Sequence, residues 1–455
     1  MLADVSRWLR EGPPARRIPW RLRAPLERAT VAHAYPRAAT PFRVSVSSVT
    51  PDAVLLLGGD LALHRWRAGD AATRFASLDA VVARADARIF NLEAQLTSRT
   101  EPAGTIGSSL RADPAALEVL QILRTSAVTC ANNHCLDFGG DALAESVTRL
   151  RDNGIAVAGA VSGADDGTIV ISVNGVSVGI AAFADDWRAP AEGVPVMSPM
   201  AHDADAVRRT IAALASSVDI VVLQLHWGYE WTMYPLRSLR DLARSYADAG
   251  AHIVACHHAH VPMAIERRGR SIIAHGLGNL HFGPGGDGGH PFEHRSFLLR
   301  VEVGKSGPSA ATVVPVETTA DGSVRLLDGR RADEVHRAMA YLGKRLDDTG
   351  YHDAVEHSAM VREGGALFLD IARRIERSDA AGLRERRAFL ERPRQRLLVP
   401  ALLRTDGASR MMGELLGRFH DEAESHDSAV ARDITANRDA VRRFLSSQAM
   451  IGRIP

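Results

Sequence analysis

The stretch 252–262, HIVACHHAHVP, joins a short aliphatic run to three histidines within positions 257–260. A short β-branched run that ends in polar residues is typical of a buried strand. In an extended segment residues i and i+2 project to the same side, so His258 and His260 are expected to face one cavity and His257 to face away. Paired imidazoles at a strand end indicate a metal site, provided that other segments supply further ligands.

Four earlier apolar runs end in the same way. They are AVLLL (53–57), ARIF (87–90), SAVTC (126–130) and DIVVLQL (219–225). The residues that follow include Asp60, Glu93, Asn133 with His134, and His226. Because ligands collect at the carboxyl ends of strands in α/β sheets, we expect these side chains to meet the histidines of 257–260.

Helical segments alternate with the runs and predict an α/β fold. Residues 139–154 and 235–250 have helical spacing and glycine at their ends, whereas Asn174-Gly175 between two apolar runs predicts a hairpin. The expected core is a mixed or two-sheet arrangement, a layered β-sandwich flanked by helices, with a helical C-terminal appendage. We assign residues 1–50 to an Arg/Pro-rich arm, 51–328 to the core domain and 329–455 to a helical region.

Composition excludes several classes of protein. A formal net charge of +1 provides no general attraction to nucleic acid. Three cysteines without disulfide spacing suit a reducing compartment, and there is no apolar run of transmembrane length. We therefore expect a cytoplasmic protein without a transmembrane segment.

The ligand types at the strand ends indicate a divalent transition metal. Carboxylates, an amide oxygen and neutral imidazoles suit Mn²⁺, Fe²⁺ or Zn²⁺, and one or two ions are expected. Two adjacent ions would clamp a tetrahedral phosphoryl or carbonyl centre and activate a bridging water.

At these residues the chain resembles the CapA family of poly-γ-glutamate capsule biosynthesis proteins, whose fold is similar to that of calcineurin-like metallophosphoesterases. The matching blocks are LLLGGDLALHR (55–65), FNLEAQLTS (90–98), CANNHCLDFGG (130–140), LHWGYEW (225–231), CHHAHVP (256–262) and HGLGNLHF (275–282).

The resemblance implies a role for each matching residue. Expected metal ligands are Asp60, Glu93, Asn133, His226, His258 and His260. Expected catalytic residues are His134, which protonates or stabilises a leaving group, Arg65, which holds a carboxylate or phosphate, and Asp137, which orients an imidazole. Glu230 is expected to orient an imidazole from behind the ligands, and His257 to support or pack beside them.

One departure from the metallophosphoesterase pattern affects the metal count. Where those enzymes have Asp-x-His, this chain reads Asp60-Leu61-Ala62, so one metal position lacks an imidazole. His64 is a candidate replacement.

Three functions follow from this reading. The first is a metal-dependent hydrolase in which an activated water attacks a phosphate ester or an amide. The second is an accessory or transferase-like enzyme of poly-γ-glutamate, peptide or natural-product amide biosynthesis, working with a separate ligase because no G-x-x-x-x-G-K-[ST] motif is present. The third is a non-catalytic binding or scaffold protein. The expected substrate is an anionic small molecule or peptide. The sequence is compatible with a partner ligase and with a homo-oligomer and decides neither.

Overall fold

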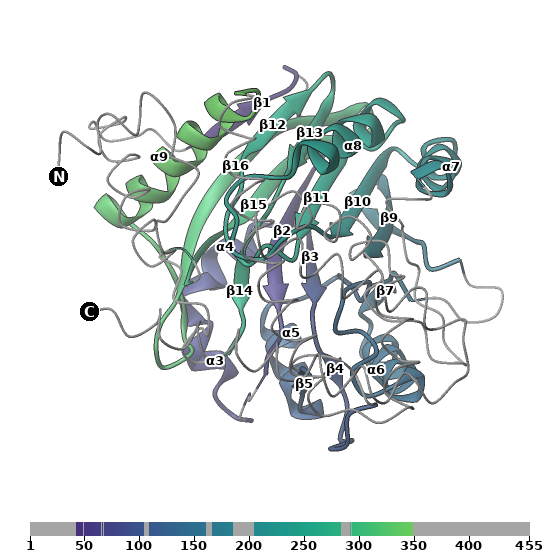
Figure 1. The fold of residues 1–455 in the computed structure, drawn as a ribbon, viewed down its shortest axis with the longest axis vertical. Coiled ribbons are helices and arrows are strands. Elements are labelled where there is room, and N and C mark those ends of the chain that lie inside the picture. Colours follow the sequence, from purple (N-terminus) through teal and green to yellow (C-terminus); the bar gives the residue numbers. More distant parts are fainter. Residues whose placement is uncertain are drawn as a thin grey trace, which may run out of the picture. The chain divides into compact units, whose positions relative to one another are not determined.

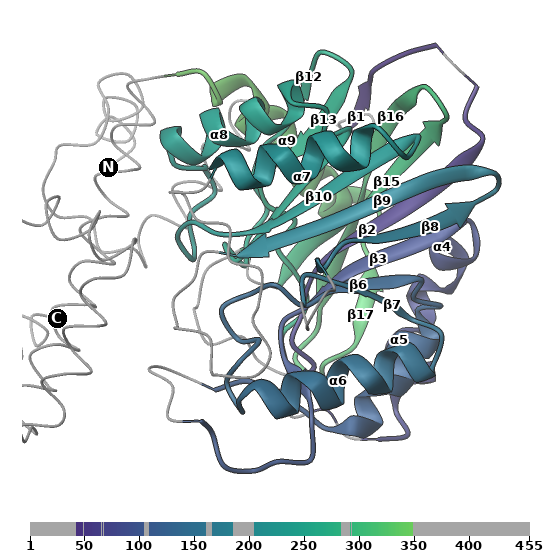
Figure 2. The same cartoon turned by 90° about the vertical axis from the view of Figure 1, so that its right-hand side faces the viewer.

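The computed structural model describes residues 42–48, 50–64, 66, 68–103, 109–160, 166–184, 204–283, 292 and 294–348. These residues form two β-sheets stacked face to face, with helices on the outer surfaces (Figures 1 and 2). The layered α/β class predicted from the sequence is confirmed, and the two main sheets are each mixed, with parallel and antiparallel pairs.

The first sheet has the path β1-β16-β15-β2-β3-β6-β7, with β14 paired to β2 and β17 to β16. The bounds are β1 Arg43–Ser45, β2 Ala53–Leu61, β3 Ala87–Leu92, β6 Ala127–Thr129, β7 Ala156–Ala158, β14 Asn279–His281, β15 Arg295–Gly304, β16 Gly307–Thr318 and β17 Val324–Leu326. The pairings β2·β3, β3·β6 and β6·β7 are parallel, so the carboxyl ends of these strands share one edge.

The second sheet has the order β12-β13-β11-β10-β9-β8. The bounds are β8 Ile169–Val173, β9 Val176–Ala184, β10 Ile220–His226, β11 Ile253–His257, β12 Ile265–Arg268 and β13 Ser271–Ala274. The predicted hairpin is β8–β9, and its turn residues Asn174 and Gly175 have φ of 50° and 80°. Two consecutive positive φ angles define the tight turn that suits a twisted hairpin, and this requirement explains the Asn-Gly pair.

Apolar residues fill three layers. Between the sheets lie Leu55 and Leu57 of β2 with Val222 and Ile253 of β10 and β11, all fully buried. Burial of each such side chain stabilises the fold by about 1.5–3 kcal/mol. The alternate residues of the same strands face the helices, so these central strands are apolar on both sides.

Helices cover the outer faces. Among the described residues, four helices pack on the first sheet: α3 Ala71–Arg74, α4 Asp79–Ala83, α5 Leu117–Ile122 and α6 Gly140–Asp152. The same layer contains the 3₁₀ turns Ala76–Leu78 and Pro114–Ala116 and the short strands β4 Gln95–Leu96 and β5 Arg111–Ala112. Helices α7 Ala204–Ala215 and α8 Arg237–Asp248 pack on the second sheet (Figure 2). The two helices expected at 139–154 and 235–250 are therefore confirmed as α6 and α8.

Helix α9 Gly329–Arg345 follows the last strand and contacts the sheets. The Phe42 amide donates to His336 Nδ1 on this helix at 3.1 Å. Residues 1–41 of the arm predicted at 1–50, and the further helices expected beyond 348, lie outside the described residues, whereas Arg43–Ser45 of that arm form β1. The domain boundaries stay predictions. Among the described residues no helix has the length and apolarity needed to cross a bilayer.

A charged network joins α8 to the edge of the second sheet. Arg244 of α8 contacts both carboxylate oxygens of Glu266 on β12 at 2.7–3.1 Å. His275, whose side chain is buried, contacts Glu266 Oε1 at 2.8 Å. Burial alone would raise the pKa of Glu266, but the hydrogen bonds from His275 and Arg244 lower it to about 2.

We predict that Glu266→Ala lowers the free energy of unfolding by about 3 kcal/mol at pH 7, because it leaves the buried His275 without its carboxylate and Arg244 with only the exposed Asp347. The folded pKa lies below the unfolded one, so this stabilisation is present above the unfolded pKa and is lost as pH falls towards about 2. Urea titrations at pH 7 and pH 3 measure both effects. The exposed pair Asp248–Arg268 supplies the control, since Asp248→Ala should cost less than about 1 kcal/mol. An equal loss for Glu266→Ala at both pH values contradicts the assignment.

Candidate metal centre

Strand ends from the two sheets meet at one place. Asp60 lies near the end of β2 and Glu93 directly follows β3, whereas His226 and His257 are the last residues of β10 and β11. His257 Nδ1 lies 2.9 Å from Asp60 Oδ1 and therefore joins the two sheets. Asp60 and Glu93 have no exposed surface.

A close backbone approach fixes Asp60. Its amide donates to the Gly278 carbonyl at 2.9 Å. A Cβ atom at Gly59 would lie 1.8 Å from that same oxygen. The glycine before Asp60 is thus required by the approach of the Gly278 segment to β2.

The histidine segment differs from the expected conformation. His258 and His260 have φ of 82° and 58°, so the chain is coiled and the prediction of an extended segment is wrong. Left-handed backbone in a non-glycine residue is strained and is concentrated at functional sites. The two side chains still face one place, with His258 Nδ1 at 3.1 Å from His226 Nε2 and His260 Nδ1 at 3.4 Å from Asp60 Oδ2.

His257 does not face away from the site as the alternation of an extended strand predicted. Its imidazole is buried between the sheets, where it contacts Asp60 and stacks on His226 with ring centroids 6.5 Å apart. Because its Nδ1 engages a carboxylate that is itself a candidate ligand, His257 supports Asp60 from behind.

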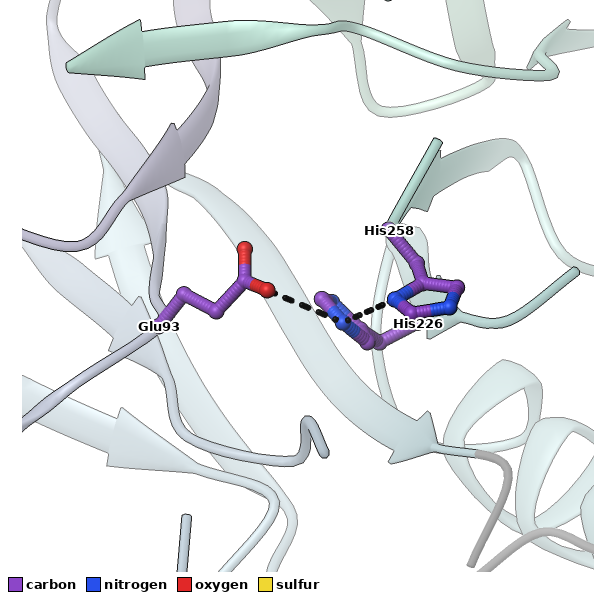
Figure 3. Close-up of side chains that lie close together, drawn as sticks. All are labelled: Glu93, His226 and His258. Atoms are coloured by element: carbon purple, nitrogen blue, oxygen red, sulfur yellow. Dashed lines mark hydrogen bonds and ion pairs between the residues drawn. The ribbon is translucent and has the colours of Figure 1, made fainter. Parts of the chain in front are cut away.

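Three groups of donor atoms could hold a metal ion. Each group places one donor atom per residue within 4.8 Å of the others. The groups are Glu93, His226 and His258; Glu230, His258 and His260; and Asp60, Glu93 and His260. In Figure 3, His226 lies between the Glu93 carboxylate, at 3.4 Å, and the His258 ring. Asn133 Oδ1 lies 2.8 Å from His226 Nε2 and adds the amide oxygen to the first group.

The pKa values of the two buried carboxylates shift in opposite directions. Burial, followed by the negative charges of Asp60 and Glu230, raises the pKa of Glu93 well above its usual range. No described residue gives either Glu93 oxygen a hydrogen bond. Burial also opposes ionisation of Asp60, but its hydrogen bonds with His257 and His260 hold its pKa well below the usual value.

The pKa values of two imidazoles, those of His226 and His260, shift in opposite directions. Burial, reinforced by the neighbouring histidines, lowers the pKa of His226 well below its usual range. For His260, burial lowers the pKa, but the bond to Asp60, the negative charges of Asp60 and Glu230 and the contact with Asn279 together raise it. A neutral imidazole is the form in which histidine binds a metal.

The donor set fits a divalent ion. Glu93 is an orphaned buried carboxylate, and imidazole nitrogens and an amide oxygen converge on the same place. A divalent cation there would satisfy Glu93 and replace the close His226–His258 contact, so the residues match the predicted chemistry.

His134 and Asp137 form a pair at the edge of the centre. His134 Nδ1 lies 2.7 Å from Asp137 Oδ2, and that oxygen also accepts the Leu110 amide at 2.6 Å. Asp137 is fully buried and His134 is 9% exposed. The carboxylate therefore fixes the ring of a buried histidine that directly follows Asn133 in the chain.

Other predicted residues have different outcomes. Arg65 lies outside the described residues, so its role stays a prediction. His64 belongs to none of the three donor groups found among the described residues. Glu230, expected to act from behind the ligands, instead lies among the candidate donors.

Three buried asparagine side chains also belong to the site, and none of them was among the site residues predicted from the sequence. Asn91 Nδ2 donates to Asp60 at 2.9 Å and lies 3.3 Å from His226 Nδ1. Asn132 Nδ2 donates to the Leu92 carbonyl at 2.8 Å, and Asn279 Oδ1 lies 2.9 Å from His260 Nδ1. Their position in the sequence could have identified them, because each lies in one of the blocks that match the family, and the blocks of Asn91 and Asn132 also contain a predicted ligand.

The family described as "Bacterial capsule synthesis protein PGA_cap" matches residues 54–284, just over half of the chain. The PGA biosynthesis protein CapA of Bacillus subtilis (strain 168) is 29% identical over 214 residues, which cover 46% of this chain and 55% of that protein. A probable polyglutamine synthesis accessory protein of Mycobacterium tuberculosis (strain ATCC 25618 / H37Rv) is 29% identical over 250 residues, covering 51% and 64%. The matched part thus spans less than two thirds of the length of these relatives.

Similarity to solved structures is weaker. A structure described as a novel phosphatase from Mycoplasma pneumoniae aligns with 62% of this chain and 95% of its own, at 13% identity and a TM-score of 0.35. A TM-score this low supports no inference.

We predict that replacing His258 and His260 by Ala removes bound transition metal, because each residue belongs to two of the three donor groups. Elemental analysis of protein purified from metal-replete medium measures the content per chain. His294→Ala is the matched control, since His294 belongs to no donor group. Equal metal in the double variant and the wild type contradicts the assigned ligands.

A second prediction concerns Glu93→Gln. The substitution removes an unpaired buried carboxylate, so the metal-free variant should unfold at a higher temperature than the metal-free wild type. The gain in melting temperature on adding Mn²⁺ or Zn²⁺ should shrink, because a ligand is lost. Scanning calorimetry with chelator and with metal gives both values. A destabilised metal-free variant with an undiminished metal response contradicts the role of Glu93.

Proposed function

Because the chain belongs to the family of bacterial capsule synthesis proteins, PGA_cap, we propose that it is a metal-dependent hydrolase of a phosphate ester or an amide. The observation that carries the proposal is the orphaned carboxylate of Glu93, buried beside convergent imidazoles.

In this proposal the strand ends hold the ion. The residues that would bind it are Asp60, Glu93, Asn133, His226, His258 and His260. A divalent ion bound there supplies Lewis acidity and brings the pKa of a bound water towards neutrality, and Mn²⁺, Fe²⁺ and Zn²⁺ all suit the donors. Burial of the donors excludes bulk water, so charges that develop at the reacting centre are stabilised more strongly than in solution.

His134 acts as the general acid. Asp137 engages Nδ1 at 2.7 Å, so the proton given to the leaving group comes from Nε2. Asp137 keeps the ring oriented and stabilises the charged imidazole. The pair thus provides the proton transfer that cleavage of an ester or amide requires.

A second candidate is an accessory role in amide polymer synthesis beside a separate ligase. The names of the relatives favour it, since one is a PGA biosynthesis protein and another a probable polyglutamine synthesis accessory protein. The same site would then act on a γ-glutamyl amide, and the ligase would supply the energy for bond formation. Both candidates therefore predict that the protein without its ligase hydrolyses such an amide.

We predict that His134→Ala keeps its metal but lowers kcat by about 10²–10⁴, the usual contribution of a general acid. Asp137→Asn should cause a smaller loss, because the ring remains but is poorly oriented. Release of nitroaniline from γ-glutamyl-p-nitroanilide measures turnover, because this amine must be protonated to leave. Release of nitrophenol from bis(p-nitrophenyl) phosphate is the control, because nitrophenol leaves as the anion and should be affected much less. Normal turnover by metal-loaded His134→Ala contradicts the assignment of the acid.

A further inference from the structure

The segment that carries His134 and Asp137 is an irregular turn between β6 and α6. Some of its internal backbone contacts are long. The Cys135 amide lies 3.4 Å from the Asn132 carbonyl, and the Asp137 amide lies 3.3 Å from the His134 carbonyl. These distances exceed the usual limit of about 3.2 Å for a strong N–H···O bond. Contacts from other segments are therefore needed to hold this turn in one conformation.

The buried side chain of Gln95 on β4 holds the end of the turn. Its Oε1 accepts the Phe138 amide at 2.6 Å, and its Nε2 donates to the Gly139 carbonyl at 2.9 Å. Gln95 is only 1% exposed. One side-chain amide thus pairs with a backbone donor and a backbone acceptor, as a neighbouring strand would. Both bonds lie within two residues of Asp137, so they fix the backbone beside the residue that orients His134.

The neighbouring strand β5 contacts the same turn. β4 and β5 pair in parallel, and the residue before β5, Leu110, donates its amide to Asp137 Oδ2. Thr97, which directly follows β4, donates its hydroxyl to Glu145 Oε2 of α6 at 2.8 Å. The small β4–β5 sheet therefore holds the turn through Gln95 and the carboxylate of Asp137 through Leu110, and it is itself joined to α6.

Gln95 lies two residues after Glu93 in the chain. One short segment therefore carries both a carboxylate that would bind the ion and the amide that holds the turn of His134. The distance between the reacting centre and the acid depends on this segment. A general acid must lie within hydrogen-bond reach of the leaving group, and a displacement of about 1 Å can lower the rate about 100-fold.

We propose that Gln95 is a positioning residue for His134. It holds the 138–139 backbone so that the imidazole, oriented by Asp137, reaches the leaving group. Gln95 itself supplies no group to the reaction and binds no ion. The proposal rests on the proposed function, in which His134 is the general acid.

Gln95→Met tests the proposal, since it keeps the length of the side chain and removes both hydrogen bonds. In the metal-loaded full-length chain, kcat for release of nitroaniline from γ-glutamyl-p-nitroanilide should fall about 10- to 100-fold, because the acid is displaced. Release of nitrophenol from bis(p-nitrophenyl) phosphate should fall much less, and metal content should stay at the wild-type value. In a His134→Ala background, Gln95→Met should cause no further loss of nitroaniline release, because no acid remains to be positioned.

Leu150→Ala is the control for general destabilisation. Leu150 is fully buried near the other end of α6, so this variant should lower the melting temperature and leave the ratio of the two release rates at the wild-type value. An equal fall in both rates for Gln95→Met, or an unchanged rate of nitroaniline release, overturns the positioning role. A further loss in the His134→Ala background also overturns it, since Gln95 would then act through another residue.

A second measurement does not depend on turnover. In the chain labelled with ¹⁵N-histidine, the ring signal of His134 is identified by its loss in His134→Ala. Gln95→Met should change this signal, because the bond from Nδ1 to Asp137 is weakened, and Leu150→Ala should not. An unchanged signal in Gln95→Met overturns the positioning role. If the metal-loaded wild type releases neither product, the proposed function is overturned, whereas a changed ring signal still supports the contact of Gln95 with the turn as the one that positions His134.

Discussion

The structure depends on placing two buried carboxylates, Asp60 and Glu93, at adjacent strand ends. Neither has exposed surface, and Glu93 accepts no hydrogen bond from the described residues. Isolated buried charge is expensive, so a protein that retains it must supply a compensating group. The second sheet supplies an imidazole to each, since His257 Nδ1 lies 2.9 Å from Asp60 Oδ1 and His226 Nε2 lies 3.4 Å from Glu93 Oε1. We propose that a cation also binds Glu93. The need to compensate these buried carboxylates therefore links the stability of the fold to the proposed binding of a metal ion.

The two-sheet architecture meets this requirement by bringing strand ends together. Parallel pairing brings β2 and β3 to one edge and β10 and β11 to another, and the apolar layer between the sheets sets the separation of those edges. Buried amides such as Asn91 bridge the remaining gap by contacting Asp60 and His226 together. Ligands held by strand ends in this way are pre-organised, which is what tight metal binding and electrostatic catalysis need.

Much of the fold was predictable because its signals are local. Apolar runs, helix ends and the Asn174-Gly175 turn each depend on neighbouring residues, and all were found where expected. The conformation of His258 and His260 was not predictable, since their left-handed backbone is imposed by tertiary contacts that outweigh strand alternation. The contact of His257 with Asp60 and the approach of Glu230 to His260 likewise arise between distant segments.

The central claim is that convergent strand ends form a divalent metal centre. Anomalous diffraction from crystals grown with Mn²⁺ tests it directly, because the scattering locates the ion independently of any assay. The account predicts a peak between Glu93, His226 and His258 that replaces the 3.1 Å contact between the two imidazoles. An ordered site without a peak, with Glu93 still lacking a partner, would contradict it.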